Sequence, residues 1–120
     1  MQKKILVAED DKAIIDVVKI ILENEGYEVF TADQGEVVHK IIKQQNPDMI
    51  LLDIWLYGED GGDIAKEIKA TPHSKDIPIV LMSANNETEK ITKKVGANDF
   101  LLKPFNIDDL LYIVRKYVKS

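Results

Sequence analysis

The stretch Asp48-Met49-Ile50-Leu51-Leu52-Asp53 decides the fold. Its uninterrupted apolar residues end in a single carboxylate, although a buried strand gains no stability from a terminal acid. An apolar run of this length is typical of a strand covered on both faces, as in the parallel sheets of α/β domains. Such sheets bind their ligands at the carboxyl ends of their strands. Asp53 is therefore predicted to take part in chemistry.

The composition narrows the class of protein. The chain has 120 residues, which is enough for one domain, and we expect a single domain over residues 1–120. Its 45% hydrophobic and 31% charged residues are typical of a soluble globular protein, and no stretch predicts a membrane span or a signal peptide. A cytoplasmic location without membrane contact is expected. The absence of cysteine excludes thiolate metal sites, and the net charge of −5 argues against direct binding of nucleic acid.

Strand-like and helix-like segments alternate on both sides of the central run. Further strands are predicted at 5–8, 27–31, 77–82 and 100–102. Helices are predicted over 11–25, after a capping box at Asp33 and Glu36, through 64–68, after a cap at Asn86, and after a cap at Asn106. Residues 54–62 are rich in glycine and acids and are predicted to form a loop.

Two of these helices differ in apolar content. The helix after Asn86 has only Ile91 and Val95 as large apolar residues, so we expect it to be the loosest in the domain. The last helix is expected to bury Ile107, Leu110, Leu111, Val114 and Val118.

Five strands alternating with five helices predict a doubly wound (βα)5 α/β sandwich around a five-stranded parallel sheet. Right-handed crossovers leave few topologies, and we expect the flavodoxin-like strand order 2-1-3-4-5. In this order the first and third strands are neighbours. Glu9 and Asp10 would then converge with Asp53, while Ser83 and Lys103 end the adjoining strands.

Three carboxylates this close repel one another, by about 3 kcal/mol for each pair at ~5 Å and an effective dielectric of ~20. Lys103 alone cannot offset this repulsion, so the cluster must take up a proton or hold a divalent cation. Ligands that are all oxygen favour Mg²⁺, with Mn²⁺ able to replace it. A carboxylate can attack phosphorus and form an acyl phosphate. Lys103, the Ser83 hydroxyl and the backbone N–H of Ala84 would bind the phosphoryl oxygens that the ion leaves uncovered.

Four separated motifs resemble the receiver (CheY-like) domains of two-component response regulators, in register across the whole chain: Ile5-Leu6-Val7-Ala8-Glu9-Asp10, Leu52-Asp53, Met82-Ser83-Ala84 and Lys103-Pro104-Phe105. The resemblance implies that Asp53 accepts a phosphoryl group from a sensor histidine kinase or a histidine phosphotransfer protein. It also implies Mg²⁺ ligands at Glu9, Asp10, Asp53 and the backbone carbonyl of Trp55.

The resemblance further implies a switch. Ser83 matches the family's switch hydroxyl, Phe100 its switch aromatic and Lys103 its invariant lysine. The bond from this lysine to the following proline is commonly cis in the family.

The sequence departs from the family at a few positions. Tyr57 stands where the family usually has proline, so the segment after Asp53 is expected to be more mobile or differently shaped. Glu9 replaces the commoner Asp, and Trp55 and Asn85 occupy positions that tune the lifetime of the phosphate.

The leading hypothesis is a signalling switch rather than an enzyme, whose only chemistry is to accept and later lose its own phosphoryl group. Phosphorylation of Asp53 would draw Ser83 inward, let Phe100 turn, and change the face formed by the fourth helix, fifth strand and fifth helix. That face would bind a downstream protein or an output domain that this chain does not carry.

Three other functions are weighed against the switch. A receiver-like module that binds partners without phosphorylation usually lacks an acid or the lysine, and neither is missing here. A phosphatase of the haloacid dehalogenase type needs a second Asp where Trp55 stands. Nucleotide-binding folds need a glycine-rich motif after the first strand, which is absent.

Overall fold

The computed structural model describes residues 2–118, so residues 1 and 119–120 of the predicted domain lie outside the described part. Its centre is a parallel sheet of five strands in the order β2-β1-β3-β6-β7. This confirms the predicted flavodoxin-like order. The strands are β1 (Lys4–Ala8), β2 (Glu28–Ala32), β3 (Met49–Asp53), β6 (Ile79–Ser83) and β7 (Asp99–Leu102).

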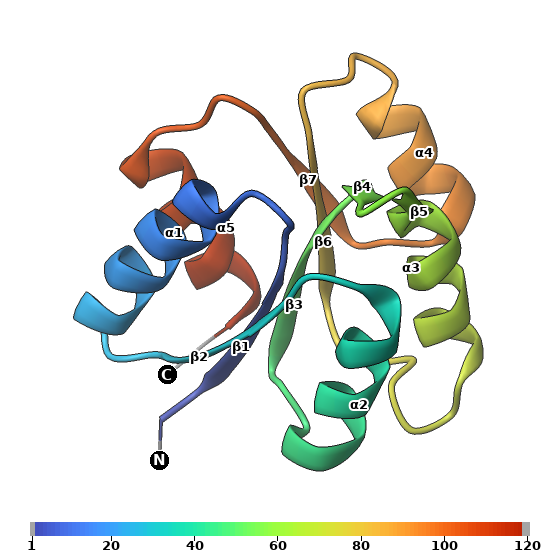
Figure 1. The fold of residues 1–120 in the computed structure, drawn as a ribbon, viewed down its shortest axis with the longest axis horizontal. Helices are drawn as coiled ribbons and strands as arrows, with labels where there is room; N and C mark the ends of the chain where they lie inside the picture. Colours follow the sequence, from blue (N-terminus) through green and yellow to red (C-terminus); the bar gives the residue numbers. More distant parts are fainter. Residues whose placement is uncertain (1, 119–120) are drawn as a thin grey trace.

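Helices cover both faces of this sheet, which gives the predicted three-layer sandwich (Figure 1). Helices α1 and α5 lie on one face, and α2, α3 and α4 lie on the other. Their bounds are α1 (Lys12–Asn24), α2 (Gly35–Gln45), α3 (Gly61–Ala70), α4 (Thr88–Val95) and α5 (Ile107–Tyr117). None of the helices within residues 2–118 is long and apolar enough to cross a bilayer.

The packing of β3 against a core on each face of the sheet explains why its sequence is continuously apolar. Ile50 and Leu52 pack into the core beneath α2, α3 and α4, whereas Met49 and Leu51 pack into the core beneath α1 and α5. All five residues of the strand are buried, including Asp53. A strand with a core on each side must be apolar at every position, so its one acid lies at the strand end.

Segment 54–62, predicted to be a loop, contains a hairpin. Strands β4 (Trp55–Leu56) and β5 (Glu59–Asp60) pair antiparallel, and Tyr57 and Gly58 form the two-residue turn between them. Both turn residues have positive φ angles, 48° and 78°, as a type I′ hairpin turn requires. The prediction was wrong because strands of two residues are too short to leave an alternating pattern.

The helix ends agree with the sequence in part. Asn106 caps α5 as predicted, in a capping box with Asp109, and Gly96 ends α4 in the left-handed conformation. The capping box at Asp33 was wrong, since α2 begins after Gln34, which makes no side-chain cap. The cap at Asn86 was also wrong, since α4 begins after Glu87 and likewise has no side-chain cap.

Ile107, in the first turn of α5, was predicted to be buried, and this prediction was wrong. Ile107 is 55% exposed, because the buried stripe of the helix runs through Leu110, Ile113 and Val114 and misses this position. Val118, just after the helix, is buried as predicted, and Leu111 packs partly buried against the same core.

Candidate functional site

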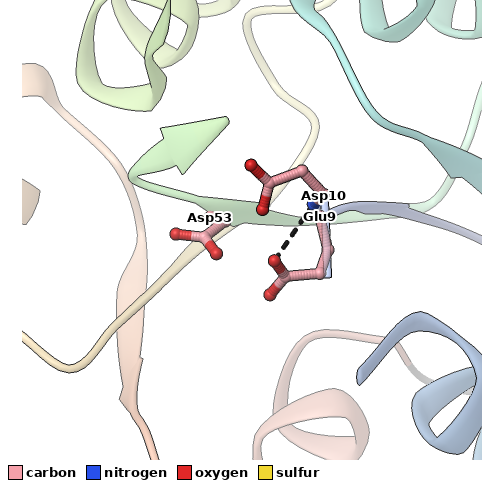
Figure 2. A group of neighbouring side chains, drawn as sticks. All are labelled: Glu9, Asp10 and Asp53. Atoms are coloured by element: carbon pink, nitrogen blue, oxygen red, sulfur yellow. Dashed lines mark hydrogen bonds between the residues drawn. The ribbon is translucent and has the colours of Figure 1, made fainter. Parts of the chain in front are cut away.

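Three acids meet at the carboxyl ends of β1 and β3. These strands are parallel neighbours in which Ala8 pairs with Leu52, so Glu9 and Asp10 leave β1 beside Asp53. One carboxylate oxygen from each of the three acids lies within 4.8 Å of the other two, and Figure 2 shows the side chains gathered around one point. The structure therefore brings together the acids that the sequence singled out.

Glu9 is the most deeply buried of the three, with 1% of its surface exposed. Its Oε2 accepts hydrogen bonds from the backbone N–H groups of Asp10, at 3.0 Å, and Asp11, at 3.1 Å; the first is the dashed line in Figure 2. Burial raises the pKa of Glu9 to about 7, and the neighbouring Asp53 adds to this while Lys103 opposes it. In the metal-free protein Glu9 therefore exchanges a proton near neutral pH.

Lys103 reaches into the cluster from the end of β7. Its Nζ lies 2.5 Å from Glu9 Oε1 and 2.6 Å from Asp53 Oδ2. Burial lowers the pKa of Lys103, but the contacts with Asp53 and Glu9 outweigh burial and raise it overall, so the ammonium stays charged. The bond between Lys103 and Pro104 is cis, as the resemblance implied.

The β4–β5 hairpin supplies backbone donors to the two aspartates. The N–H of Trp55 donates to Asp53 Oδ1 at 2.9 Å, and the N–H of Tyr57 donates to Asp10 Oδ2 at 3.0 Å. The side chains of Trp55 and Tyr57 are exposed, so these residues serve the site through their main chain. The Tyr57 contact could not be predicted from the sequence, because a backbone donor has no residue-type signature; Gly58 after Tyr57 was the available signal for the turn.

Ser83 lies at the end of β6, between the strands that carry Asp53 and Lys103. Met82 pairs with Asp53, and the N–H of Lys103 donates to the Ser83 carbonyl at 2.9 Å. The Ser83 hydroxyl accepts from the N–H of Asn85 at 2.9 Å, and Ala84 between them is exposed. Ser83 and Ala84 thus lie at the carboxyl ends of the strands, where the acids also lie.

Phe100 is half-buried on β7, where it pairs with Leu81. It lies two strand positions before Leu102, the residue paired with Ser83, and therefore away from the edge where the acids meet.

The donor set fits a hard divalent cation. Its side-chain ligands are carboxylates, all three within reach of one ion, and the single lysine leaves a formal charge of −2 when every acid is ionised (three negative charges and one positive). Mg²⁺ suits oxygen ligands and an incomplete protein cage, because it keeps several of its own waters. Beside Asp53, such a site has the groups needed for transfer of a phosphoryl group.

Comparison with known proteins gives a family and a close relative in sequence. The family described as the response regulator receiver domain matches residues 5–115. The transcriptional regulatory protein KdpE of Staphylococcus aureus (strain NCTC 8325 / PS 47) is 39% identical over 125 residues, covering 100% of this chain and 53% of KdpE. The chain thus spans about half the length of that relative.

Solved structures agree with this match over the whole chain. The chemotaxis protein CheY4 of Vibrio cholerae is 28% identical, with a TM-score of 0.91 over 98% of this chain and 100% of CheY4. The receiver domain of the sensor histidine kinase PA1611 from Pseudomonas aeruginosa PAO1 is 29% identical, with a TM-score of 0.90 over 100% of both chains. That structure has a magnesium ion coordinated in its active-site cleft.

Proposed function

Because the chain belongs to the family of response regulator receiver domains, we propose that it accepts a phosphoryl group on Asp53 in a Mg²⁺-dependent reaction. One observation carries the proposal: Asp53, only 6% exposed at the end of β3, has an acid on one side and a lysine 2.6 Å away. A structural acid at a strand end does not need a partly buried lysine and two further carboxylates around it.

The ligands proposed for Mg²⁺ are the carboxylates of Glu9, Asp10 and Asp53 and the backbone carbonyl of Trp55. Bound there, the ion neutralises charge on one phosphoryl oxygen. The buried Glu9, whose pKa is raised to about 7 chiefly by burial, must lose its proton to act as a ligand.

The other phosphoryl oxygens are assigned to groups of the chain. Lys103 neutralises a second oxygen, and the Ser83 hydroxyl with the N–H of Ala84 binds the third. An Asp53 oxygen forms the new bond to phosphorus as the bond from phosphorus to the donor nitrogen breaks, and the electron pair of that bond stays on the donor imidazole. The chain accelerates this exchange by holding the acceptor in place and neutralising charge, which is what phosphoryl transfer requires.

The proposed donor is a histidine kinase or a histidine phosphotransfer protein, and the surface around the site supports a protein donor. A groove of about 470 Å³ opens beside Lys103, lined by Ile14, Val17, Pro104 and Phe105 among others. Val17 is 56% exposed and Ile20, on the same helix, is 60% exposed. Contiguous apolar surface next to a reactive site is typical of protein–protein contact.

The proposed output follows the predicted switch. Phosphorylation of Asp53 draws in the Ser83 hydroxyl and lets Phe100 turn inward, which changes the face of α4, β7 and α5 that binds a downstream protein or output domain. Leu102 is 48% exposed and Tyr112 is 71% exposed on β7 and α5, so these elements have apolar surface for a partner. A cytoplasmic location, the lack of direct nucleic-acid binding and the lack of an output domain in residues 1–120 stay predictions.

Trp55, the only tryptophan and 62% exposed next to Asp53, gives a direct test. Mg²⁺ should change its fluorescence, acetyl phosphate should change it further, and mass spectrometry should find one phosphoryl group on Asp53. The Asp53→Asn variant should keep the fold and lose the second change. A wild-type protein that binds Mg²⁺ but gains no phosphate from acetyl phosphate or from a phosphorylated histidine protein would favour the phosphorylation-independent binding module.

A further inference from the structure

The β4–β5 hairpin is anchored by hydrogen bonds at three points. At its turn, the N–H of Tyr57 donates to Asp10 Oδ2 at 3.0 Å. On β5, Glu59 Oε2 accepts from the N–H of Gly35, the first residue of α2, at 2.9 Å. At its base, the N–H of Gly61 donates to the carbonyl of Ile54 at 2.5 Å. The hairpin therefore connects α2 to Asp10, one of the three clustered acids.

The base of the hairpin leaves little freedom. A Cβ atom at Gly61 would lie 2.2 Å from the carbonyl oxygen of Asp53 and 2.8 Å from the Cα of Ile54. Such a close approach is possible only for glycine, and the atoms opposite are main chain, which cannot turn aside. The turn at Tyr57 is consequently held at a set position relative to Asp53.

Of the three acids, Asp10 has the fewest hydrogen bonds recorded on its carboxylate within residues 2–118. Lys103 binds Glu9 and Asp53, and Glu9 is also held by two backbone N–H groups. Asp10 is half-buried, and the hydrogen bond from Tyr57 is the one that the structure records on its carboxylate within residues 2–118. Without that bond, repulsion from the other two acids would turn the Asp10 carboxylate toward solvent.

We propose that the hairpin is a positioning device for the metal site, in which the backbone N–H of Tyr57 orients Asp10 and Glu59 anchors the turn to α2. The inference deepens the proposed function and rests on it for the identity of the ion. Hydrogen bonds that orient metal ligands typically change metal affinity about 10–100-fold when they are removed. Tyr57 acts through its main chain, because its side chain is 66% exposed and its backbone N–H, in a residue with a φ of 48°, makes the contact with Asp10.

The main test compares two substitutions at position 57. Tyr57→Gly keeps the N–H and accepts the positive φ, so its Kd for Mg²⁺ should stay within about twofold of the wild type. Tyr57→Pro removes the N–H and cannot adopt a positive φ, so its Kd should rise about tenfold or more. Isothermal titration calorimetry measures both without relying on Trp55. Equal Mg²⁺ affinity in the two variants would overturn the proposal.

Position 59 provides a second test that leaves the turn intact. Glu59→Gln keeps an oxygen that can accept from Gly35, whereas Glu59→Ala does not, and both remove the same charge. Glu59→Ala should bind Mg²⁺ several-fold more weakly than Glu59→Gln, with a downfield-shifted Tyr57 amide proton retained in the Gln variant and lost in the Ala variant. Equal Mg²⁺ affinity and an unchanged Tyr57 amide in both variants would show that α2 does not anchor the turn.

These measurements separate the two proposals. Mg²⁺ affinity is determined without a phosphodonor, so weaker binding in Tyr57→Pro supports the positioning role even if Asp53 is never phosphorylated. Conversely, a wild type that is phosphorylated in Mg²⁺, together with unchanged affinity in Tyr57→Pro, overturns the positioning role alone. A wild-type protein that binds no Mg²⁺ would overturn both.

Discussion

The acid site and the neighbouring α4–β7 side of the sheet are built in opposite ways. At the acid site, Glu9 and Asp53 are buried and hydrogen-bonded to Lys103. Helix α4 has eight residues and no side-chain cap, and two of its three buried residues are threonines, Thr88 and Thr92. The edge strand beside it leaves Leu102 about half exposed.

This difference suits the two tasks of the proposed function. Groups that transfer a phosphoryl group must be held in place before the reaction, and charged hydrogen bonds do this well. A surface that changes shape needs two arrangements separated by only a few kcal/mol, and thin apolar packing allows this. The two regions meet at Ser83, whose carbonyl accepts from the N–H of Lys103 while its hydroxyl accepts from Asn85 in the loop before α4. In the proposed switch, Ser83 is therefore a residue through which a change at the acid site would reach the loop before α4.

Removing the central cation should have the largest effect on the acid site. Lys103→Met leaves Glu9 and Asp53 buried without a counter-charge, so the free energy of unfolding at pH 8 should fall by about 3–5 kcal/mol. At pH 6 the loss should be smaller, because Glu9 takes up a proton. Urea unfolding in EDTA measures both values. Lys116→Met, which removes the exposed partner of Asp99, is the matched control and should leave stability nearly unchanged; similar losses in the two variants would contradict the contrast.

A methyl group at the base of the hairpin should disturb the acid site through the main chain. Gly61→Ala places its Cβ against the carbonyl of Asp53, so we expect a loss of about 3 kcal/mol in thermal unfolding and weaker Mg²⁺ binding. Gly26→Ala is the control, because an added Cβ at Gly26 has no atom within 4 Å, although Gly26, unlike Gly61, has a positive φ. That variant should lose about 1 kcal/mol through its backbone alone and bind Mg²⁺ like the wild type. Unchanged Mg²⁺ binding in Gly61→Ala would show that the site tolerates movement of its backbone.

The charge of Glu9 should make Mg²⁺ binding depend on pH. With its pKa raised to about 7, Glu9 is mostly protonated at pH 6 and mostly ionised at pH 8, so the affinity should rise about tenfold between these values, with release of up to one proton. In EDTA, where no Mg²⁺ is bound, the pH dependence has the opposite sign: the contribution of Glu9 to folding stability falls as the pH rises. The folded pKa lies above the unfolded one, so the contribution of Glu9 is fully present below about pH 4.5 and is lost as pH rises through about 7.

Calorimetry in buffers with different ionisation enthalpies measures the number of protons released. Glu9→Gln should bind Mg²⁺ more weakly and lose the dependence on pH between 6 and 8. A wild-type affinity that is the same at pH 6 and pH 8 would show that Glu9 is already ionised in the metal-free protein.

The strand order and the convergence of the acids could be predicted from the sequence for a physical reason. Strands with a core on both sides are apolar throughout, and polar residues at their ends meet wherever the strands are neighbours. Asp53, Glu9 and Lys103 are chemically conspicuous in such a pattern.

The parts that escaped prediction depend on the main chain or on distant partners. The Tyr57 donor is a backbone N–H, which any residue except proline has. The acceptor for the first N–H of α2 is Glu59, 24 positions along the chain, whereas the sequence suggested the local Asp33. Capping rules consider only neighbouring residues, so a cap supplied by another element is invisible to them.

The smallest effect is expected on α4, and its sign tests the contrast most directly. The buried hydroxyl of Thr92 donates at 2.7 Å to the carbonyl of Thr88, the residue four positions earlier in the same helix. Such a bond adds little, because the backbone ladder of the helix already uses this carbonyl. Thr92→Val replaces the hydroxyl with a methyl group of similar shape, so we expect a gain of about 0.5 kcal/mol in urea unfolding and slower exchange of the α4 amide protons.

Thr88→Val is the matched variant with the opposite expectation. Its hydroxyl is also buried, but it donates to the carbonyl of Asn85 in the loop between β6 and α4, which has only the N–H of Thr88, at 3.2 Å, as a further recorded backbone donor and lies outside the helix ladder. We therefore expect a loss of stability in Thr88→Val and faster exchange in the first turn of α4. If both substitutions stabilise the protein, both buried hydroxyls destabilise α4, and Thr88 does not hold the loop before α4. If Thr92→Val instead destabilises it, then α4 depends on its polar core contacts in the same way as the acid site does, and the two regions are not built differently.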